Sequence, residues 1–439
     1  MNYLDTVNNA DSNQVVDGMV QIKANYLANG YFLPATNPLR DNSINTIKDH
    51  FSGTSTLHPY NLKVYLATSV VAHCFDGWLY LSQAIDCLLK GDKGAAIHLA
   101  YYAELRGTMS FLARQGVLVN NRRHLSISSH GIINCAKKDG THVATWKFLE
   151  NWINSPNVDH TPLLRYFTVK GKTFDYWIGA IPSPVSSQVA STITLQWLKN
   201  WSFDIQNYED DRAFRNTVSY QPQHLVDNFP IDFKAKFSGI TNIWKFIEPS
   251  STDKFALLDK YLFSRLFHNI HQYSLPPSTT ITLQQLISQT FTADGSGDDE
   301  AIKSIVAHGI TNQLFTTAGN PTIISATGKL MPLNIISRAL LLLRISSGCV
   351  FDLMTSAGIN KNQIDFYLNN LGNNNGFWNG PTPANFDHLW ADVTDSISFI
   401  DELLQEPDDI ILKDLYDEWP KELHYFKQIS RASFWGSCA

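Results

Sequence analysis

Two long patterns of apolar residues with helical spacing, at residues 61–89 and 93–115, constrain the fold more than any other feature. Steps of three and four residues between apolar side chains place them on one face of an α-helix. Gly91 and Gly116 follow the two patterns directly, at the position where glycine commonly ends a helix. The chain is therefore expected to be built mainly from helices.

Similar patterns recur through the rest of the sequence. We predict further helices at residues 11–29, 141–154, 187–204, 251–273, 301–314, 333–357, 386–404 and 411–429. An alternating run after the loop at residues 120–130 and a segment at 322–330 indicate short β hairpins. The predicted fold class is mainly α, with a multi-helix bundle core, minor β hairpins and a helical C-terminal part.

Three regions are expected along the 439 residues. Residues 1–60 form an N-terminal helix and an irregular arm, residues 61–290 form the helical core, and residues 291–439 form the C-terminal helical region. The segment 292–300 is small, acidic and broken by glycines, which is typical of a solvated linker.

The overall charge limits the classes of partner. A net charge of −6 and a pI near 6.1 argue against a protein that coats nucleic acid electrostatically, although they leave room for a local basic pocket. Charged residues make up only 17% of the chain. Much of the polar surface must come from uncharged side chains, so we expect a homo-oligomer or a partner protein subunit.

Cysteine usage and hydropathy indicate a soluble cytoplasmic protein. The five cysteines are scattered without a CxxC pair, which suits buried thiols in a reducing compartment. The start of the chain lacks the basic and apolar runs of a secretory signal. The most apolar segment, 333–354, contains Arg338, Arg344 and Asp352, so we predict a buried helix and no membrane association.

The usual sequence motifs of enzymes are missing. The sequence contains no GxxxxGK[ST] phosphate loop, no GxGxxG after a strand, no HExxH, no GxSxG and no zinc pattern of cysteines and histidines. The sequence therefore does not indicate a nucleotide hydrolase, a Rossmann enzyme or a zinc protease. We expect neither a metal nor a cofactor.

The best candidate site is the polar segment 208–224, which follows an amphipathic run. It contains Arg215 followed directly by Asn216, then Tyr220 and His224. Because guanidinium groups grip phosphate through two hydrogen bonds and stay charged, Arg215 is the natural ligand for a phosphate.

This segment, together with Tyr101, Tyr102 and the helix that ends at Gly116, resembles the HEPN superfamily and, more closely, the YaaC-like helical proteins of bacteria. HEPN proteins include RNA-cleaving toxins and defence effectors, whose motif is an arginine, often followed by a polar residue, and a histidine after four to six variable residues. Arg215 and Asn216 fit that motif, but Tyr220 stands at the nearest histidine position and His224 comes later.

The resemblance implies an RNA partner and metal-independent ribonuclease activity. Cleavage needs a group that takes the proton of the ribose 2′-hydroxyl, one that protonates the leaving oxygen, and a cation on the phosphate. Arg215 would be the cation, and Tyr220 or His224 would lie over it if the helix ends before Pro222. Asn216 completes the motif.

Further residues are candidates for binding the substrate. Arg106 lies on an apolar helix, where an unpaired charge is costly, and is a candidate for lining the same site. Arg123, His124 and His130 lie in and after a loop where they would hold a phosphate. Arg123 and His130 also have the spacing of the HEPN motif, without its Asn-like residue.

Two other interpretations remain open. In the first, Asp210, Asp211, Arg212 and Arg215 form a salt-bridge network between helices, closed by the polar groups of Asn216 and Tyr220. In the second, the protein is a non-catalytic interaction or scaffold subunit of a multi-component bacterial defence complex. Its aromatic C-terminal segment 424–436 would then be the docking edge.

Overall fold

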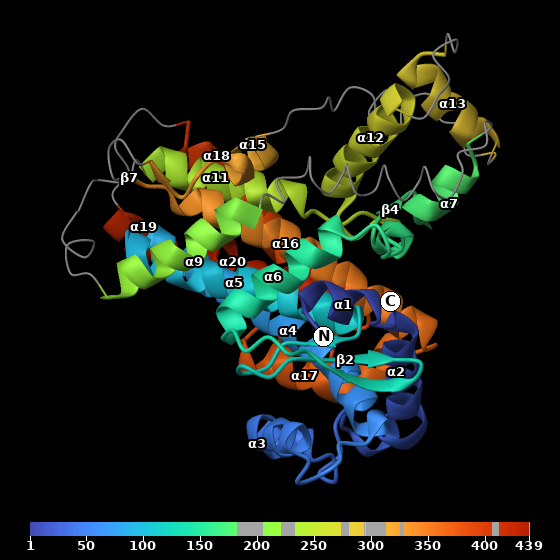
Figure 1. The fold of residues 1–439 in the computed structure, drawn as a ribbon. Helices are drawn as coiled ribbons and strands as arrows, with labels where there is room; N and C mark the ends of the chain where they lie inside the picture. The colour runs from blue at the N-terminus through green and yellow to red at the C-terminus, as the bar shows by residue number, and fades with distance from the viewer. Residues whose placement is uncertain are drawn as a thin grey trace.

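The computed structural model describes residues 1–181, 205–220, 233–273, 281–293, 295, 313–324, 329–405 and 412–438. Its helices are α1 (Tyr3–Asn8), α2 (Ser12–Asn25), α3 (Leu39–Ser52), α4 (Pro59–Leu89), α5 (Lys93–Arg114), α6 (Thr141–Asn154), α7 (Phe174–Gly179), α9 (Ile205–Tyr220), α11 (Phe233–Phe246), α12 (Ala256–Tyr273), α13 (Leu283–Ala293), α15 (Gln313–Gly319), α16 (Pro332–Ser356), α17 (Asp365–Asn374), α18 (Asp387–Leu403), α19 (Leu412–Glu418), α20 (Pro420–Phe426) and α21 (Ala432–Ser437). The fold is mainly α, as predicted (Figure 1).

Three small antiparallel sheets complete the described structure. They consist of β1 (Val117–Leu118), β2 (Leu125–Ser128) and β3 (Gly131–Asn134); of β4 (Thr168–Val169) and β5 (Lys172–Thr173); and of β6 (Ile323–Ile324) and β7 (Lys329–Leu330). The first sheet confirms a strand after residue 130, namely β3, but β2 lies inside the segment 120–130 that was expected to be a loop. The third confirms the hairpin expected at 322–330, with Ile323 opposite Leu330.

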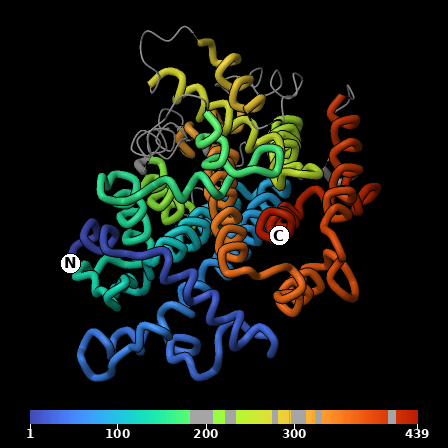
Figure 2. Tube along the Cα trace, turned by 90° about the vertical axis from the view of Figure 1, so that its right-hand side faces the viewer, coloured from blue at the N-terminus to red at the C-terminus, as the bar shows by residue number. Residues whose placement is uncertain are grey.

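The two long helices predicted at the start, α4 and α5, form the centre of the molecule together with α16. Asp92 caps the N-terminus of α5 by accepting a hydrogen bond from the Ala95 amide at 2.9 Å. Glycine permits the close approach of α16, because a Cβ on Gly77 would lie 2.5 Å from Leu343 Cδ2. Figure 2 shows α16 as the orange helix in the middle of the molecule.

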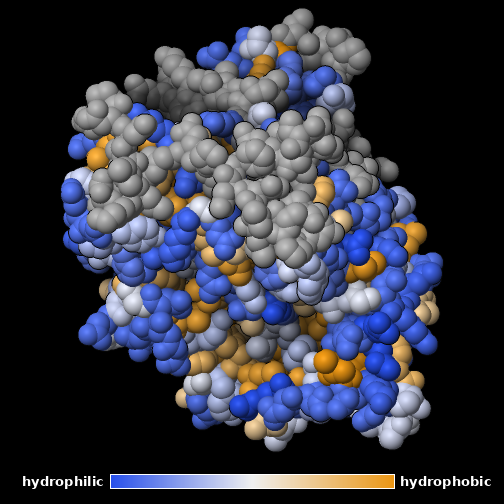
Figure 3. All heavy atoms as spheres, turned by 90° about the vertical axis from the view of Figure 1, so that its left-hand side faces the viewer, coloured by the Kyte–Doolittle hydropathy of each residue, from blue (hydrophilic) through white to orange (hydrophobic). Residues whose placement is uncertain are grey.

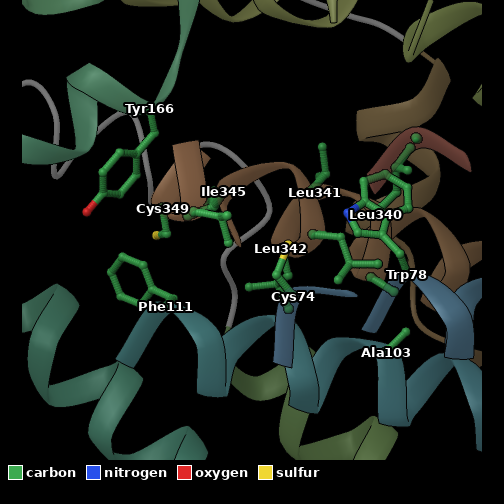
Figure 4. Close-up of a cluster of buried hydrophobic side chains, with 14 of the residues drawn as sticks. Cys74, Trp78, Ala103, Phe111, Tyr166, Leu340, Leu341, Leu342, Ile345 and Cys349 are labelled. Carbon is green, nitrogen blue, oxygen red and sulfur yellow. The ribbon is translucent and has the colours of Figure 1, made fainter. Parts of the chain in front are cut away.

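Apolar side chains of α16 fill the space between α4 and α5. Figure 4 shows Leu340, Leu342 and Ile345 of α16 lying over Trp78 and Phe111, and all of these side chains are buried. Burial of apolar area of this kind contributes most of the stability of such a core, at about 25 cal/mol per Å².

The charged residues of α16 are buried as ion pairs with three other helices. Arg338 pairs with Asp211 of α9, Arg344 with Asp259 of α12, and Asp352 with Arg114 of α5, each with a 2.6 Å contact. Since an unpaired buried charge is strongly destabilising, these pairs fix how α16 lies against its neighbours.

The predicted buried helix at 333–354 is confirmed. By length and composition α16 would be apolar enough to cross a membrane, but 94% of its most apolar window is buried inside the protein. It is the core helix of a soluble fold.

Two sequence predictions need correction. The N-terminal arm, expected to be irregular, contains α3 (Leu39–Ser52), which buries Leu39 and Ile47. The single helix expected at 411–429 is divided into α19 and α20, and Pro420 begins the second because proline suits the first turn of a helix. The helix predicted at 187–204, most of the one at 301–314 and almost all of the linker at 292–300 lie outside the described residues.

Candidate functional site

The polar segment of the sequence analysis is folded into α9, which divides its residues between two faces. Tyr208, Asp211, Arg215 and Val218 are buried, at the three- and four-residue steps of a helical face. Tyr220 is 77% exposed. The buried face of α9 packs against α5 and α6, and its two charged residues, Asp211 and Arg215, lie one helical turn apart.

Asp211 belongs to a closed hydrogen-bond network. Arg338 donates from Nε and Nη2 to Asp211 Oδ2 at 2.8 and 2.6 Å, and Thr322 donates to Asp211 Oδ1. The Nη1 group of Arg338 donates to the carbonyls of Ala318 and Asn320, each at 2.7 Å. Neither Asp211 nor Arg338 is exposed, so this network is a structural fastening of α9, α15 and α16.

Glu104 of α5 adds a second carboxyl group to this network. It is fully buried, its Oε1 lies 3.5 Å from Arg338 Nε, and neither oxygen makes a hydrogen bond with a described residue. Burial and the neighbouring Asp211 raise the pKa of Glu104 well above its usual value. Burial also raises the pKa of Asp211, although Arg338 and Thr322 act in the opposite direction. Of the two carboxyl groups, Glu104 is the one whose protonated form is favoured more strongly by its surroundings.

Arg215, one turn further along α9, lies in different surroundings. Its guanidinium carbon is 5.2 Å from the ring centre of Tyr101 and 5.7 Å from that of Tyr102, both on α5. The side chain is only 9% exposed, and its Nε has no hydrogen-bond partner in the described part of the chain. Within those same residues the Nε of Arg212 is also buried and unpaired. Two guanidinium groups therefore retain hydrogen-bonding capacity here.

Two histidines complete this group. His98 of α5 shares a 2.7 Å hydrogen bond with the hydroxyl of Ser219, and His142 of α6 shares a 3.1 Å hydrogen bond with that of Tyr101. We call Arg212, Arg215, Tyr101, Tyr102, His98 and His142 the Arg215 cluster. It joins α5, α6 and α9.

The hydrogen bond to Ser219 determines which ring nitrogen of His98 carries the proton. The Ser219 hydroxyl already donates to the carbonyl of Arg215 at 2.6 Å, so the proton shared with His98 must sit on Nδ1. Nε2 of His98 then carries a free lone pair, since it makes no hydrogen bond to any residue that the structure describes.

The pKa values of both histidines favour the neutral form. Burial and the charge of Arg215 lower the pKa of His98. Burial, followed by the charges of Arg215, Arg212, Arg106 and His98, lowers the pKa of His142 to about 4. A neutral imidazole beside a fixed cation is suited to accept a proton at neutral pH.

Arg106 was expected to line the same site, and its charge reaches the cluster. Its guanidinium lies 3.1 Å from Nδ1 of His73 and 3.2 Å from a carboxylate oxygen of Asp76. Arg106 also contributes to the lowered pKa of His142. It is half-buried and already has partners, so it borders the cluster rather than forming its centre.

Other predicted site residues lie elsewhere. Asn216 and Tyr220 are exposed on the opposite face of α9, because residues five apart on a helix differ by about 140° in direction. The expectation that Tyr220 lies over Arg215 is therefore wrong. His224 lies outside the described residues.

The second predicted group is also divided. His124 is fully buried, with Nδ1 3.3 Å from the Asn120 amide and Nε2 3.1 Å from the Asp139 carbonyl, so it cannot hold a phosphate. Arg123 and His130 lie on either side of β2, and no contact joins their side chains among the described residues.

The salt-bridge interpretation of the polar segment is confirmed for Asp211. Asp211 pairs with Arg338 of α16 and not with an arginine of its own helix. The C-terminal segment proposed as a docking edge is largely buried, including Phe426, Phe434 and Trp435, because it packs α20 and α21 onto the core.

Neither His98 nor His142 was among the site residues predicted from the sequence. The signal for His98 was present, since His98, Tyr101 and Tyr102 stand at the three- and four-residue steps of one helix face. No pattern in the local sequence indicates that this face contacts α9.

Among the residues that the structure describes, no group of three or more His, Cys, Asp or Glu side chains is arranged to hold a metal ion. No family model, curated protein or solved structure matches the chain.

Proposed function

We propose that the protein is an RNA-directed, metal-independent ribonuclease, acting as a HEPN/YaaC-like effector in the bacterial cytoplasm, with the Arg215 cluster as its site. One observation carries the proposal. A buried arginine with an unpaired Nε lies beside two histidines whose pKa values are lowered. Burying a cation without an anion beside it costs free energy. A bound phosphate would supply the negative charge that Arg215 lacks.

Each residue of the cluster has a distinct role in this mechanism. Nε2 of His98 accepts the proton of the ribose 2′-hydroxyl, whose oxygen then attacks the adjacent phosphorus. Arg215 and Arg212 offset the negative charge that builds up on the phosphoryl oxygens. The 5′-oxygen leaves with a proton from solvent, so the products are a 2′,3′-cyclic phosphate and a 5′-hydroxyl end.

The tyrosine rings hold Arg215 in place. A guanidinium over an aromatic face is stabilised by the ring's charge distribution, and Tyr101 and Tyr102 both serve Arg215 in this way. Preorganising the cation in this way avoids reorienting it during the reaction.

The proposal is tested with Arg215→Ala. We expect cleavage of a labelled single-stranded RNA, measured with chelator present, to fall by about 10²–10³-fold. The matched control is Arg40→Ala, an exposed arginine of α3, which should cleave at the wild-type rate. An Arg215→Ala protein that is folded and fully active would disprove the assignment.

The non-catalytic alternative is supported by the burial of Arg215 between α5 and α9, which suits an arginine that only fastens helices. In that case Arg215→Ala lowers the unfolding midpoint strongly, and wild-type protein does not cleave RNA. The protein is then a helical subunit for an oligomer or a partner.

A further inference from the structure

A second cluster of cations lies away from the Arg215 cluster, in a groove of about 630 Å³. Three segments line it: the last turns of α3, the loop between β1 and β2, and the segment that follows β3. Lys48, Arg122, Arg123 and Lys138 supply four positive charges, and none of the described residues that line the groove is acidic. Figure 3 shows the face of the molecule that lies on the left in Figure 1, where hydrophilic and hydrophobic side chains are interspersed on the described surface.

The four cations lack partners, unlike the buried arginines of the core. Arg114, Arg338 and Arg344 each pair with an aspartate. In contrast, the side chains of Lys48, Arg122, Arg123 and Lys138 make neither an ion pair nor a hydrogen bond with any residue described by the structure. In a chain of net charge −6, a convergence of four unpaired cations creates a local positive field that attracts an anion.

The groove has a fixed shape, and His124 is the residue that sets it. Through its two ring nitrogens His124 contacts the Asn120 amide and the Asp139 carbonyl, which belong to two of the three lining segments. The Cys135 amide also donates to the His124 carbonyl at 3.0 Å. His124 is thus a positioning residue behind the groove. Arg122 adopts a φ of 57°, a conformation that favours glycine and that persists only where the surroundings enforce it.

The lining also includes apolar surface suited to a base. Phe51 of α3 is half-buried at the groove, next to Cys135 and Ala136. A positively charged groove with an aromatic side chain is the arrangement by which proteins bind single-stranded nucleic acid, with phosphates on the cations and a base stacked on the ring. Its volume lies in the range of sites for molecules of nucleotide size, whereas a duplex would not enter it.

We propose that this groove binds the backbone of single-stranded RNA, with Lys48, Arg123 and Lys138 on phosphates and Phe51 against a base. The choice of RNA as the ligand rests on the proposed function, while the affinity for a phosphate backbone rests on the groove itself. The groove then holds the substrate strand and contributes to affinity rather than to the chemical step.

Binding is measured by fluorescence anisotropy with a labelled 2′-O-methyl oligouridine. This probe lacks the 2′-hydroxyl, so the proposed reaction cannot consume it. The test variant is Lys48→Gln/Arg123→Gln/Lys138→Gln. The matched control is Lys63→Gln/Lys245→Gln/Lys421→Gln, which removes the same charge from other surfaces. All test positions are exposed or half-exposed, so both proteins should keep the wild-type unfolding midpoint.

We expect the test variant to bind at least about tenfold more weakly at about 100 mM salt, and the slope of log Kd against log salt to fall by about 2. The control should bind within about twofold of wild type. Phe51→Leu, which keeps an apolar side chain, should weaken binding about fivefold or more.

Three outcomes overturn the inference: wild-type protein that does not bind the probe, a test variant that binds like wild type, or free UMP that competes as well as the oligonucleotide. Arg215→Ala separates the two proposals. If both assignments hold, Arg215→Ala cleaves no RNA, whereas Lys48→Gln/Arg123→Gln/Lys138→Gln loses affinity for the probe. If Arg215→Ala cleaves normally, the proposed function fails, while the groove assignment is still decided by the anisotropy result for the groove variant.

Discussion

Asp211 and Arg215 lie one turn apart on the same face of α9, yet their surroundings differ. Asp211 is saturated: Arg338 and Thr322 satisfy both of its oxygens. Arg215 is buried almost as deeply, but its Nε is unpaired and its neighbours are tyrosines and neutral histidines. The density of charged residues in a sequence therefore does not distinguish a structural ion pair from a functional site. What distinguishes them is whether the partners in the fold complete the hydrogen bonds.

The largest effect on stability is expected from Asp211→Asn. It leaves the buried Arg338 without its carboxylate, and removing one partner of a buried pair typically costs about 3–5 kcal/mol. We expect a loss near the lower limit, because Glu104 can ionise and pair with Arg338 from 3.5 Å. Urea denaturation measures the loss. Glu209→Gln on the same helix serves as the control and should change the free energy of unfolding by less than about 0.5 kcal/mol. Equal losses of free energy of unfolding in the two variants would contradict the conclusion that Asp211 belongs to a closed hydrogen-bond network.

His98→Ala is expected to have the largest effect on catalysis without a comparable effect on folding. Loss of a general base lowers the rate by about 10²–10⁴-fold. His130→Ala, an exposed histidine on the hairpin, should leave cleavage unchanged. In wild type the rate should rise with pH through the lowered pKa of His98 and level off above about 6.5. Burial and the charge of Arg215 favour the neutral form of His98. A pH-independent rate would rule out His98 as the base.

The two regions should respond to pH in opposite directions. The pKa of His142 is lowered to about 4 in the folded protein, so the unfolded chain binds the extra proton first as the pH falls below about 6.5. Its contribution to stability is present at neutral pH and is lost towards pH 4. His142→Phe should weaken this part of the pH dependence of the unfolding midpoint. If the dependence is unchanged between pH 7 and 4, the cluster does not hold His142 neutral.

Glu104 should show the reverse sign. Its pKa is raised in the folded protein, so the stability that its proton provides is present at low pH and declines as the pH rises above about 4.5. Glu104→Gln mimics the protonated form, and we expect it to raise the unfolding midpoint slightly at pH 8 and to have little effect at pH 4. A lower midpoint at pH 8 would mean that Glu104 is ionised in the network.

Much of the helical fold could be predicted from the sequence, whereas the site could be predicted only in part. The periodicity of α4, α5 and α16 can be seen in the local sequence, and the burial of α16 follows from the same local pattern. The short helix α3 and the break before Pro420 depend on tertiary packing and on a single proline. Arg215 was recognised because it lies in a dense polar segment. Its true neighbours, His98 and His142, come from helices more than 70 residues earlier in the chain, and only the packing of α9 on α5 and α6 brings them to it.

The most direct test of this account measures two quantities, the free energy of unfolding and the rate of RNA cleavage, on both Arg215→Ala and Asp211→Asn. The account predicts that Arg215→Ala loses cleavage while its free energy of unfolding stays within about 2 kcal/mol of wild type, since a desolvated arginine–aromatic contact contributes about that much. Asp211→Asn should lose stability while its folded fraction still cleaves RNA. The account is contradicted if Arg215→Ala is destabilised as strongly as Asp211→Asn, or if it cleaves RNA at the wild-type rate.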